Sequence, residues 1–82
     1  MSTLHPTHLA DASLDLRGTP CPINFVRTKL KLDQMASGQL LEVFLDAGEP
    51  IEQVPDSLRM EGYLIENLDD RGGFFALSVR CP

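Results

Sequence analysis

The stretch that decides the fold, residues 17–24, reads RGTPCPIN. Over residues 13–17, which lead into this stretch, apolar and polar side chains alternate. This pattern predicts a short strand with one apolar face. Gly18 and the proline two residues later then break this strand. We expect Cys21 to be the N-cap of a helix whose first residue is Pro22, because the missing N–H of proline loses no partner there. The stretch therefore predicts a strand-to-helix junction with a lone thiol at the helix start.

Two interpretations of this thiol are open. In the first, Cys21 is a nucleophile, because the backbone N–H groups of residues 23–25 and the positive end of the helix dipole would favour its thiolate. Basic residues also gather here, since four of the seven in the chain fall between positions 17 and 31. In the second, Cys21 only fills space in the core, as buried cysteines often do. The local pattern is compatible with both roles.

Length and composition indicate one globular domain of 82 residues, 43% of them hydrophobic. The net charge of −5 argues against direct binding of nucleic acid or of an anionic membrane. The two cysteines lie 60 residues apart and form neither a disulfide framework nor a zinc motif, so we expect no metal or other cofactor. The N-terminus lacks a secretion signal and no apolar run is long enough to span a membrane, so we expect a cytoplasmic protein.

The predicted first helix covers residues 22–37, ends before Gly38 and carries two apolar stripes. One stripe, which we expect to pack on the sheet, consists of Phe25, Leu32, Met35 and Ala36, with Thr28 beside them. The other lies on nearly the opposite side and consists of Ile23, Val26 and Leu30, with Arg27 and Lys31 next to it. A helix on a two-layer domain buries one stripe against the sheet. The second stripe therefore either packs under a loop or forms a docking surface for a partner.

Four further segments complete the predicted fold. An almost continuous apolar run over 40–45 predicts a central strand, parallel to the first because a helix connects them. A second helix begins near Pro50 and ends before Gly62, and strands over 63–68 and 74–80 form an antiparallel hairpin. We expect an α/β (α+β) two-layer sandwich of order β-α-β-α-β-β, with a mixed four-stranded sheet and both helices on one face. Residues 13–82 form this domain and residues 1–12 a flexible N-terminal segment.

Together these segments resemble the TusA/SirA-type family of sulfur carriers. The likeness covers residues 13–80 and is carried by LDLRG at 14–18, the Cys21-Pro22 helix start, Gly38, and the second helix opening at Glu49-Pro50. The resemblance implies a small two-layer α/β fold and a sulfurtransferase activity in which Cys21 carries sulfur as a persulfide. It also implies a sulfur-donor protein, such as a desulfurase or a rhodanese-like protein, and a sulfur-acceptor protein. Such carriers serve tRNA thiolation, cofactor assembly or sulfur oxidation.

The junction and the resemblance together define a candidate site. Cys21 is its nucleophile, Arg17, Gly18, Pro22 and Asn24 are supporting residues, and partner docking falls to Ile23, Val26, Arg27, Leu30 and Lys31. Asn24 replaces the second proline of the family's C-P-x-P motif, and we expect its polar side chain beside the thiol. Cys81 is expected either to be inert or to resolve the persulfide as a disulfide. The alternative function is a protein-interaction or regulatory module with a structural Cys21.

Overall fold

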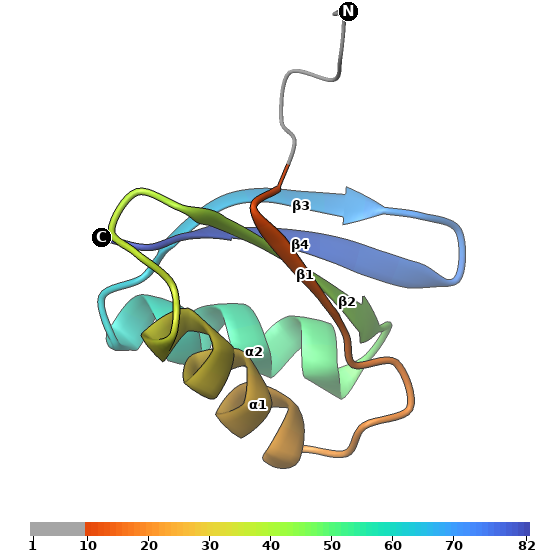
Figure 1. The fold of residues 1–82 in the computed structure, drawn as a ribbon. Helices are drawn as coiled ribbons and strands as arrows, with labels where there is room; N and C mark the ends of the chain where they lie inside the picture. The colour runs from red at the N-terminus through yellow and green to blue at the C-terminus, as the bar shows by residue number, and fades with distance from the viewer. Residues whose placement is uncertain (1–9) are drawn as a thin grey trace, which may run out of the picture.

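The computed structural model describes residues 10–82, which form a four-stranded sheet with two α-helices on one face (Figure 1). In chain order the elements are β1 (Ala12–Asp15), α1 (Ile23–Asp33), β2 (Leu40–Asp46), α2 (Glu49–Met60), β3 (Leu64–Asp70) and β4 (Phe74–Arg80). The predicted element order and the predicted two-layer architecture are confirmed.

The flexible segment predicted for residues 1–12 lies mostly outside the described residues, which begin at position 10. Within the described part, Asp11 is bound to the first residue of β2. Its backbone N–H donates to the carbonyl oxygen of Leu40 at 2.8 Å, and its Oδ2 accepts from the Leu40 N–H at 2.8 Å. The chain is therefore already anchored to the sheet one residue before β1 begins at Ala12.

The sheet is mixed and has the strand order β1-β2-β4-β3. β1 pairs in parallel with β2, as predicted from the helix that connects them. β4 lies antiparallel to both β2 and β3, which confirms the predicted hairpin. Because β1 and β2 run in the same direction, the loops that follow them leave the sheet at the same end, where both strands finish. The two helices therefore begin at the same end of the domain (Figure 1).

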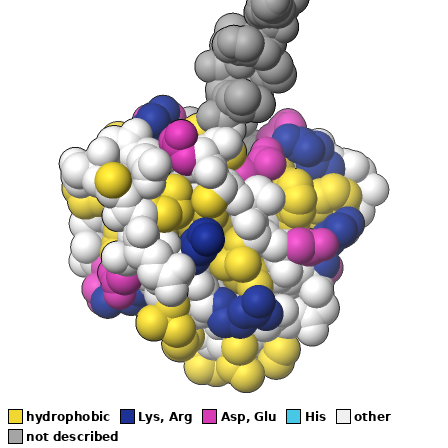
Figure 2. Space-filling model, viewed as in Figure 1, with side chains coloured by type: hydrophobic (Ala, Val, Ile, Leu, Met, Phe, Trp, Pro, Cys, Tyr) yellow, Lys and Arg dark blue, Asp and Glu magenta, His cyan; other side chains and the backbone are white. Residues whose placement is uncertain are grey.

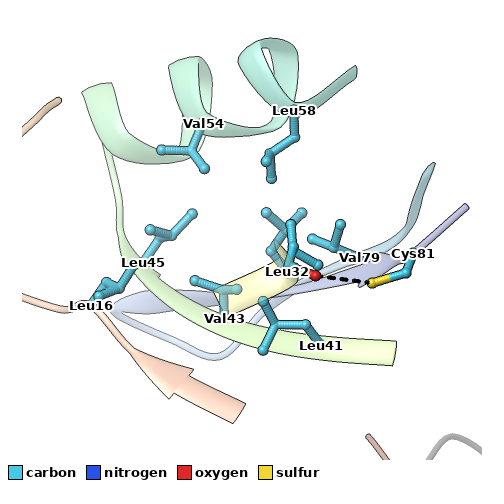
Figure 3. Packing of buried hydrophobic residues seen from close by; sticks show 10 residues of the cluster. Leu16, Leu32, Leu41, Val43, Leu45, Val54, Leu58, Val79 and Cys81 are labelled. Atoms are coloured by element: carbon cyan, nitrogen blue, oxygen red, sulfur yellow. Dashed lines mark hydrogen bonds between the residues drawn. The ribbon is translucent and has the colours of Figure 1, made fainter. Parts of the chain in front are cut away.

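The core lies between the sheet and the helices (Figure 3). Its buried aliphatic side chains from β2, β4, α1 and α2 are Leu41, Val43, Leu45, Leu77, Val79, Leu32, Val54 and Leu58. The three from β2 occupy alternate positions, so they all point to the helix side of the sheet. Burial of one such side chain stabilises the fold by about 1.5–3 kcal/mol. This layer therefore fixes both helices, and with them the loops that enter them.

α1 is shorter than predicted and ends at Asp33 rather than at residue 37. The N–H groups of Gln34 and Met35 donate to carbonyl oxygens three residues earlier, both at 3.0 Å, so the last turn tightens and the helix stops. Gly38 follows in a separate turn with φ of 85°, and its N–H donates to the carbonyl oxygen of Cys81 at 3.0 Å. This contact ties the segment after α1 to the far end of the chain.

α2 is a continuous α-helix from Glu49, with Pro50 in its first turn and Gly48 as its N-cap. Pro55 lies inside the helix and is buried, and it removes one backbone donor without interrupting the helical backbone. From the sequence, a proline at position 55 predicts an irregular, 3₁₀-like first turn of this helix, and the continuous helix shows that this prediction is wrong. Packing of Val54 and Leu58 on the sheet outweighs the lost hydrogen bond.

Candidate functional site

Cys21 lies in the loop between β1 and α1 and is partly exposed. The N-cap of α1 is Pro22, whose φ and ψ are −94° and 9°, and the first helical residue is Ile23. The prediction that Cys21 is the N-cap and Pro22 the first helical residue is wrong by one position. The peptide bond between these two residues is cis. The thiol thus precedes the helix directly but is not part of its cap.

Three amides that open α1 donate to backbone or side-chain oxygens of neighbouring residues. The Asn24 N–H donates to the carbonyl oxygen of Pro20 at 3.1 Å, and the Val26 N–H donates to that of Pro22 at 3.1 Å. The Phe25 N–H donates to Oδ1 of the preceding Asn24 at 2.7 Å. Of the three amides expected to face the sulfur, those of residues 24 and 25 therefore have other partners. The geometry does not provide the amide cradle that the sequence pattern suggests.

The hydrogen-bond partner of the sulfur is instead a side chain of α2. The Cys21 S–H donates to Oε1 of Gln53 across 3.6 Å, and Nε2 of Gln53 donates to Oε2 of Glu49 at 3.2 Å. Sequence reasoning missed Gln53 because it lies 32 residues from the cysteine. The signal that could have found it is the predicted topology. The loops after two parallel strands lie at the same end of the sheet, where the functional groups of α/β proteins gather.

Arg17 lies at the other end of the loop, on the sheet face away from the helices. Its Nε and Nη2 donate to the two carboxylate oxygens of Asp15 at 2.9 and 2.7 Å. The guanidinium stacks over the ring of Phe74 at 4.5 Å and lies 5.7 Å from the centre of the Phe44 ring. The hydrogen bonds from Arg17 lower the pKa of Asp15 to about 2, and in turn they raise the pKa of Arg17. The charge of Arg17 is thus paired at β1.

Gly18 fixes the direction of the loop. Its φ is 81°, which glycine adopts at little cost, and its N–H donates to Oδ2 of Asp46 at 2.6 Å. The residue before the arginine, Leu16, is fully buried and its N–H donates to the carbonyl oxygen of Phe44 at 2.9 Å. The loop that carries Cys21 is therefore tied to the end of β2 at its first residues.

Asn24 is fully buried, and its side chain belongs to the interior of the domain. Its Oδ1 accepts from the Phe25 amide, whereas its Nδ2 has no hydrogen-bond partner within the described residues. Its carbonyl oxygen accepts from Oγ1 of Thr28 at 2.8 Å. A side chain that accepts from a first-turn amide satisfies one of the free donors at a helix start. The side chain thus satisfies one first-turn amide of α1, and its described hydrogen bonds do not include the thiol.

The second stripe of α1 is exposed, as expected for one of the two alternatives. Ile23, Val26 and Leu30 are 51%, 47% and 57% exposed. Arg27 is exposed beside them, and Lys31 is partly exposed. Figure 2 shows apolar and basic side chains interleaved on the part of the surface where α1 lies in Figure 1. The structure thus excludes packing of this stripe under a described loop, and its use as a docking surface stays a prediction.

Cys81 lies far from Cys21. It is 5% exposed and belongs to the core, where its S–H points to the carbonyl oxygen of Leu32 at 3.8 Å (Figure 3). Burial raises the pKa of the Cys81 thiol. Leu32 is in the last turn of α1 and Cys21 precedes the first, so the helix separates the two thiols by roughly 15 Å. A disulfide requires Cα atoms within about 7 Å, so this fold does not bring the cysteines together for one.

The described residues, 10–82, contain no helix with the length and apolar character needed to cross a membrane. The same part of the chain contains no group of three or more His, Cys, Asp or Glu side chains placed to hold a metal ion.

The family model described as sulfurtransferase TusA matches residues 12–81. A protein of Archaeoglobus fulgidus named "Putative sulfur carrier protein" is 40% identical over 63 residues, which are 77% of this chain and 72% of that protein. The protein YedF of Escherichia coli, which bears the same descriptive name, is 34% identical over 62 residues, 76% of this chain and 80% of its own length. The crystal structure of a SirA-like protein from Desulfitobacterium hafniense has the same fold, with a TM-score of 0.73, 23% identity, and coverage of 84% of this chain and 95% of that one. The chain therefore belongs to the sulfurtransferase TusA family of sulfur carriers.

Proposed function

We propose that the chain carries sulfur as a persulfide on Cys21 and relays it from a donor protein to an acceptor protein. The observation that carries the proposal is the accessibility of the thiols in the described chain: Cys21 is partly exposed, whereas Cys81 is buried. Family membership supplies the class of reaction, and the accessible thiol supplies the atom that performs it. We also retain the cytoplasm as the site of the relay, because a carrier thiol must be kept reduced between cycles.

Both half-reactions are exchanges at sulfur and balance without a redox cofactor. In the first, the Cys21 thiolate attacks the terminal sulfur of a donor persulfide, the S–S bond of the donor breaks, and the donor thiolate leaves. In the second, an acceptor thiolate attacks the terminal sulfur on Cys21, and the Cys21 thiolate leaves. The proton of the resting thiol goes to solvent. The chain must therefore present one reachable sulfur, and it needs no second catalytic group.

In this proposal, both partners bind to the exposed stripe formed by Ile23, Val26 and Leu30. These residues follow one another at helical spacing from the end of α1 nearest Cys21. Arg27 on the same face carries a positive charge, although the chain as a whole has a net charge of −5. A partner with an apolar centre and acidic side chains around it fits this surface. Because the stripe adjoins the thiol, donor and acceptor would occupy it in turn.

The alternative, a protein-interaction module with a structural Cys21, uses the same stripe but gives the thiol no chemistry. A structural cysteine is expected to be buried among apolar side chains, as Cys81 is. Partial exposure of Cys21 and its hydrogen bond to the Gln53 side chain favour the carrier over this alternative.

Sulfur loading tests the carrier directly. Incubation of the full chain with a sulfane-sulfur donor is expected to add about one sulfur mass, roughly 32 Da, by thiolate attack on the donor. The variant Cys21→Ser is expected to gain nothing, and Cys81→Ala is expected to load like the unmodified chain. An adduct that persists in Cys21→Ser, or a failure of the unmodified chain to load, would contradict the proposal.

A second pair of variants separates loading from docking. Leu30→Asp places a charge in the exposed stripe, and Met60→Asp places one on α2, at a residue that is 88% exposed and does not belong to the stripe. Loading from a small polysulfide is expected to be normal in both. Transfer to or from a protein partner is expected to fall only in Leu30→Asp, because a charge in an apolar contact must be desolvated. Equal transfer by both variants would remove the stripe from the docking surface.

A further inference from the structure

Gln53 is an exposed residue of α2 that the proposed reaction does not yet use. Its side-chain amide lies between two groups of different chemistry, the Cys21 sulfur at 3.6 Å and the Glu49 carboxylate at 3.2 Å. Gln53 and Glu49 are four residues apart on one helix, so their side chains lie on the same face. The loop after β1 brings the sulfur to that face. Three side chains thus form one short hydrogen-bonded chain.

The orientation of the Gln53 amide follows from the chemistry of its neighbours. An ionised carboxylate only accepts hydrogen bonds, so the NH₂ group of Gln53 must face Glu49. The amide oxygen is then left to face the sulfur. An amide oxygen can accept a hydrogen bond from a thiol, but it offers no donor to a thiolate or to the anionic terminal sulfur of a persulfide. The arrangement therefore suits the resting, protonated sulfur and not the anionic forms.

We propose, on the basis of the carrier function above, that Gln53 is a positioning residue that follows the charge on the sulfur, and that Glu49 sets its resting direction. With a protonated sulfur, the amide oxygen faces Cys21. When the sulfur becomes anionic, the amide turns about its last side-chain bond and presents Nε2 to it. Glu49 and the anionic sulfur then compete for the same NH₂ group. The pair keeps the unloaded thiol less reactive than it would be without Glu49.

Other charges near this end of the domain are already engaged or lie on the same helix. Arg17 is paired with Asp15 on the far face of the sheet, and Asp46 accepts from the Gly18 amide. Glu52, the neighbour of Gln53, has no hydrogen bond to it within the described residues, although it carries the same charge as Glu49. Glu49→Gln and Glu52→Gln therefore remove one negative charge each from the same helix start. Only the first replaces the carboxylate that accepts from Gln53, and that can only accept, with an amide that can either donate or accept and so no longer fixes the direction of Gln53.

The test measures the rate at which iodoacetamide alkylates Cys21 in the full chain carrying Cys81→Ala. Glu49→Gln is expected to react roughly two- to five-fold faster at neutral pH, the size of effect expected for an exposed polar interaction. Glu52→Gln is expected to react like its parent. Gln53→Ala is expected to react faster, because the thiol loses its acceptor, and Gln53→Glu is expected to react more slowly, because a carboxylate then faces the sulfur.

The pH profile separates positioning from a merely structural effect. All these rates are expected to converge at alkaline pH, where the thiol is ionised in every variant, whereas a change in access would persist there. Equal acceleration by Glu49→Gln and Glu52→Gln would overturn the role of Glu49. A Gln53→Glu rate at or above the parent rate would overturn the role of Gln53. Because alkylation uses no sulfur donor, this result is independent of persulfide loading, and failure of loading alone would count against the carrier function instead.

Discussion

The two thiols of this chain are predicted to differ in reactivity by about two orders of magnitude while the protein is folded. Cys81 reacts only when the end of the chain opens. Its N–H donates to the carbonyl oxygen of Gln39 at 2.9 Å, its carbonyl oxygen accepts from Gly38 at 3.0 Å, and its side chain is 5% exposed. Two backbone hydrogen bonds contribute about 1 kcal/mol each, and burial of the side chain contributes about 1 kcal/mol more.

An opening free energy of about 3 kcal/mol corresponds to a population of roughly one in a hundred or less. The reaction of Cys81 is therefore expected to be at least about 100-fold slower than that of a freely accessible thiol. Burial also raises the pKa of this thiol, so the unopened form contributes little reactive thiolate. Cys21 is partly exposed and needs no such opening.

Alkylation of the two single-cysteine variants, Cys21→Ser and Cys81→Ala, followed by intact-mass spectrometry, gives the two rates separately. In denaturant, both variants are expected to react at comparable rates, which controls for intrinsic chemistry. Comparable rates in the folded proteins, or faster reaction of Cys81, would show that the core does not protect the C-terminal thiol. The assignment of sulfur loading to the exposed cysteine would then lose its structural basis.

Three further predictions concern the loop and the first turn. Gly18→Ala is expected to lower the free energy of unfolding, measured in urea, by about 1 kcal/mol. An added Cβ would meet no atom within 4 Å, so the cost comes from the backbone, whose φ of 81° is strained for alanine. Unchanged or higher stability would be inconsistent with this reason. Asn24→Ala is expected to cost about 1 kcal/mol through loss of the side-chain acceptor for the Phe25 amide, and a stabilised variant would show that the buried Nδ2, which has no partner among the described residues, dominates. The Asp15 pKa is lowered from its ordinary value of 3.8 to about 2, so the stability that Arg17 contributes through this pair is complete above about pH 4 and is lost as pH falls through 2. NMR titration of the Asp15 carboxyl checks this, since Arg17→Ala should return its pKa toward the ordinary value, and an unchanged midpoint would rule out the pair as the cause.

Local sequence patterns were sufficient for the element order. Each element has its own apolar spacing in the sequence. Examples are the alternation before Gly18, the apolar run of β2, and the helical spacing of Ile23, Val26 and Leu30. Such periodicities are properties of neighbouring residues, so they survive without knowledge of the rest of the fold. For the same reason, a second apolar stripe away from the sheet could be anticipated, whereas its exposure was one of two alternatives that the structure decided. Only one face of a helix can contact the sheet.

The surroundings of the thiol depended on contacts that no local pattern encodes. Whether Cys21 or Pro22 caps α1 was decided by where the amides of residues 24 and 25 found acceptors. The chain after α1 is held by the bond between Gly38 and Cys81, which joins segments 43 residues apart.

Sequence alone determined that a cysteine stands at a strand-to-helix junction of a β-α-β-α-β-β domain, because hydrophobic spacing and turn residues act over a few positions. Tertiary structure alone decided that the sulfur faces Gln53, that Asn24 turns inward, and that Cys81 is sealed in the core. Each of these outcomes requires two distant segments to be packed against each other. How close two such segments come is set by the packing free energy of the whole sheet and both helices, and not by the local preference of either segment.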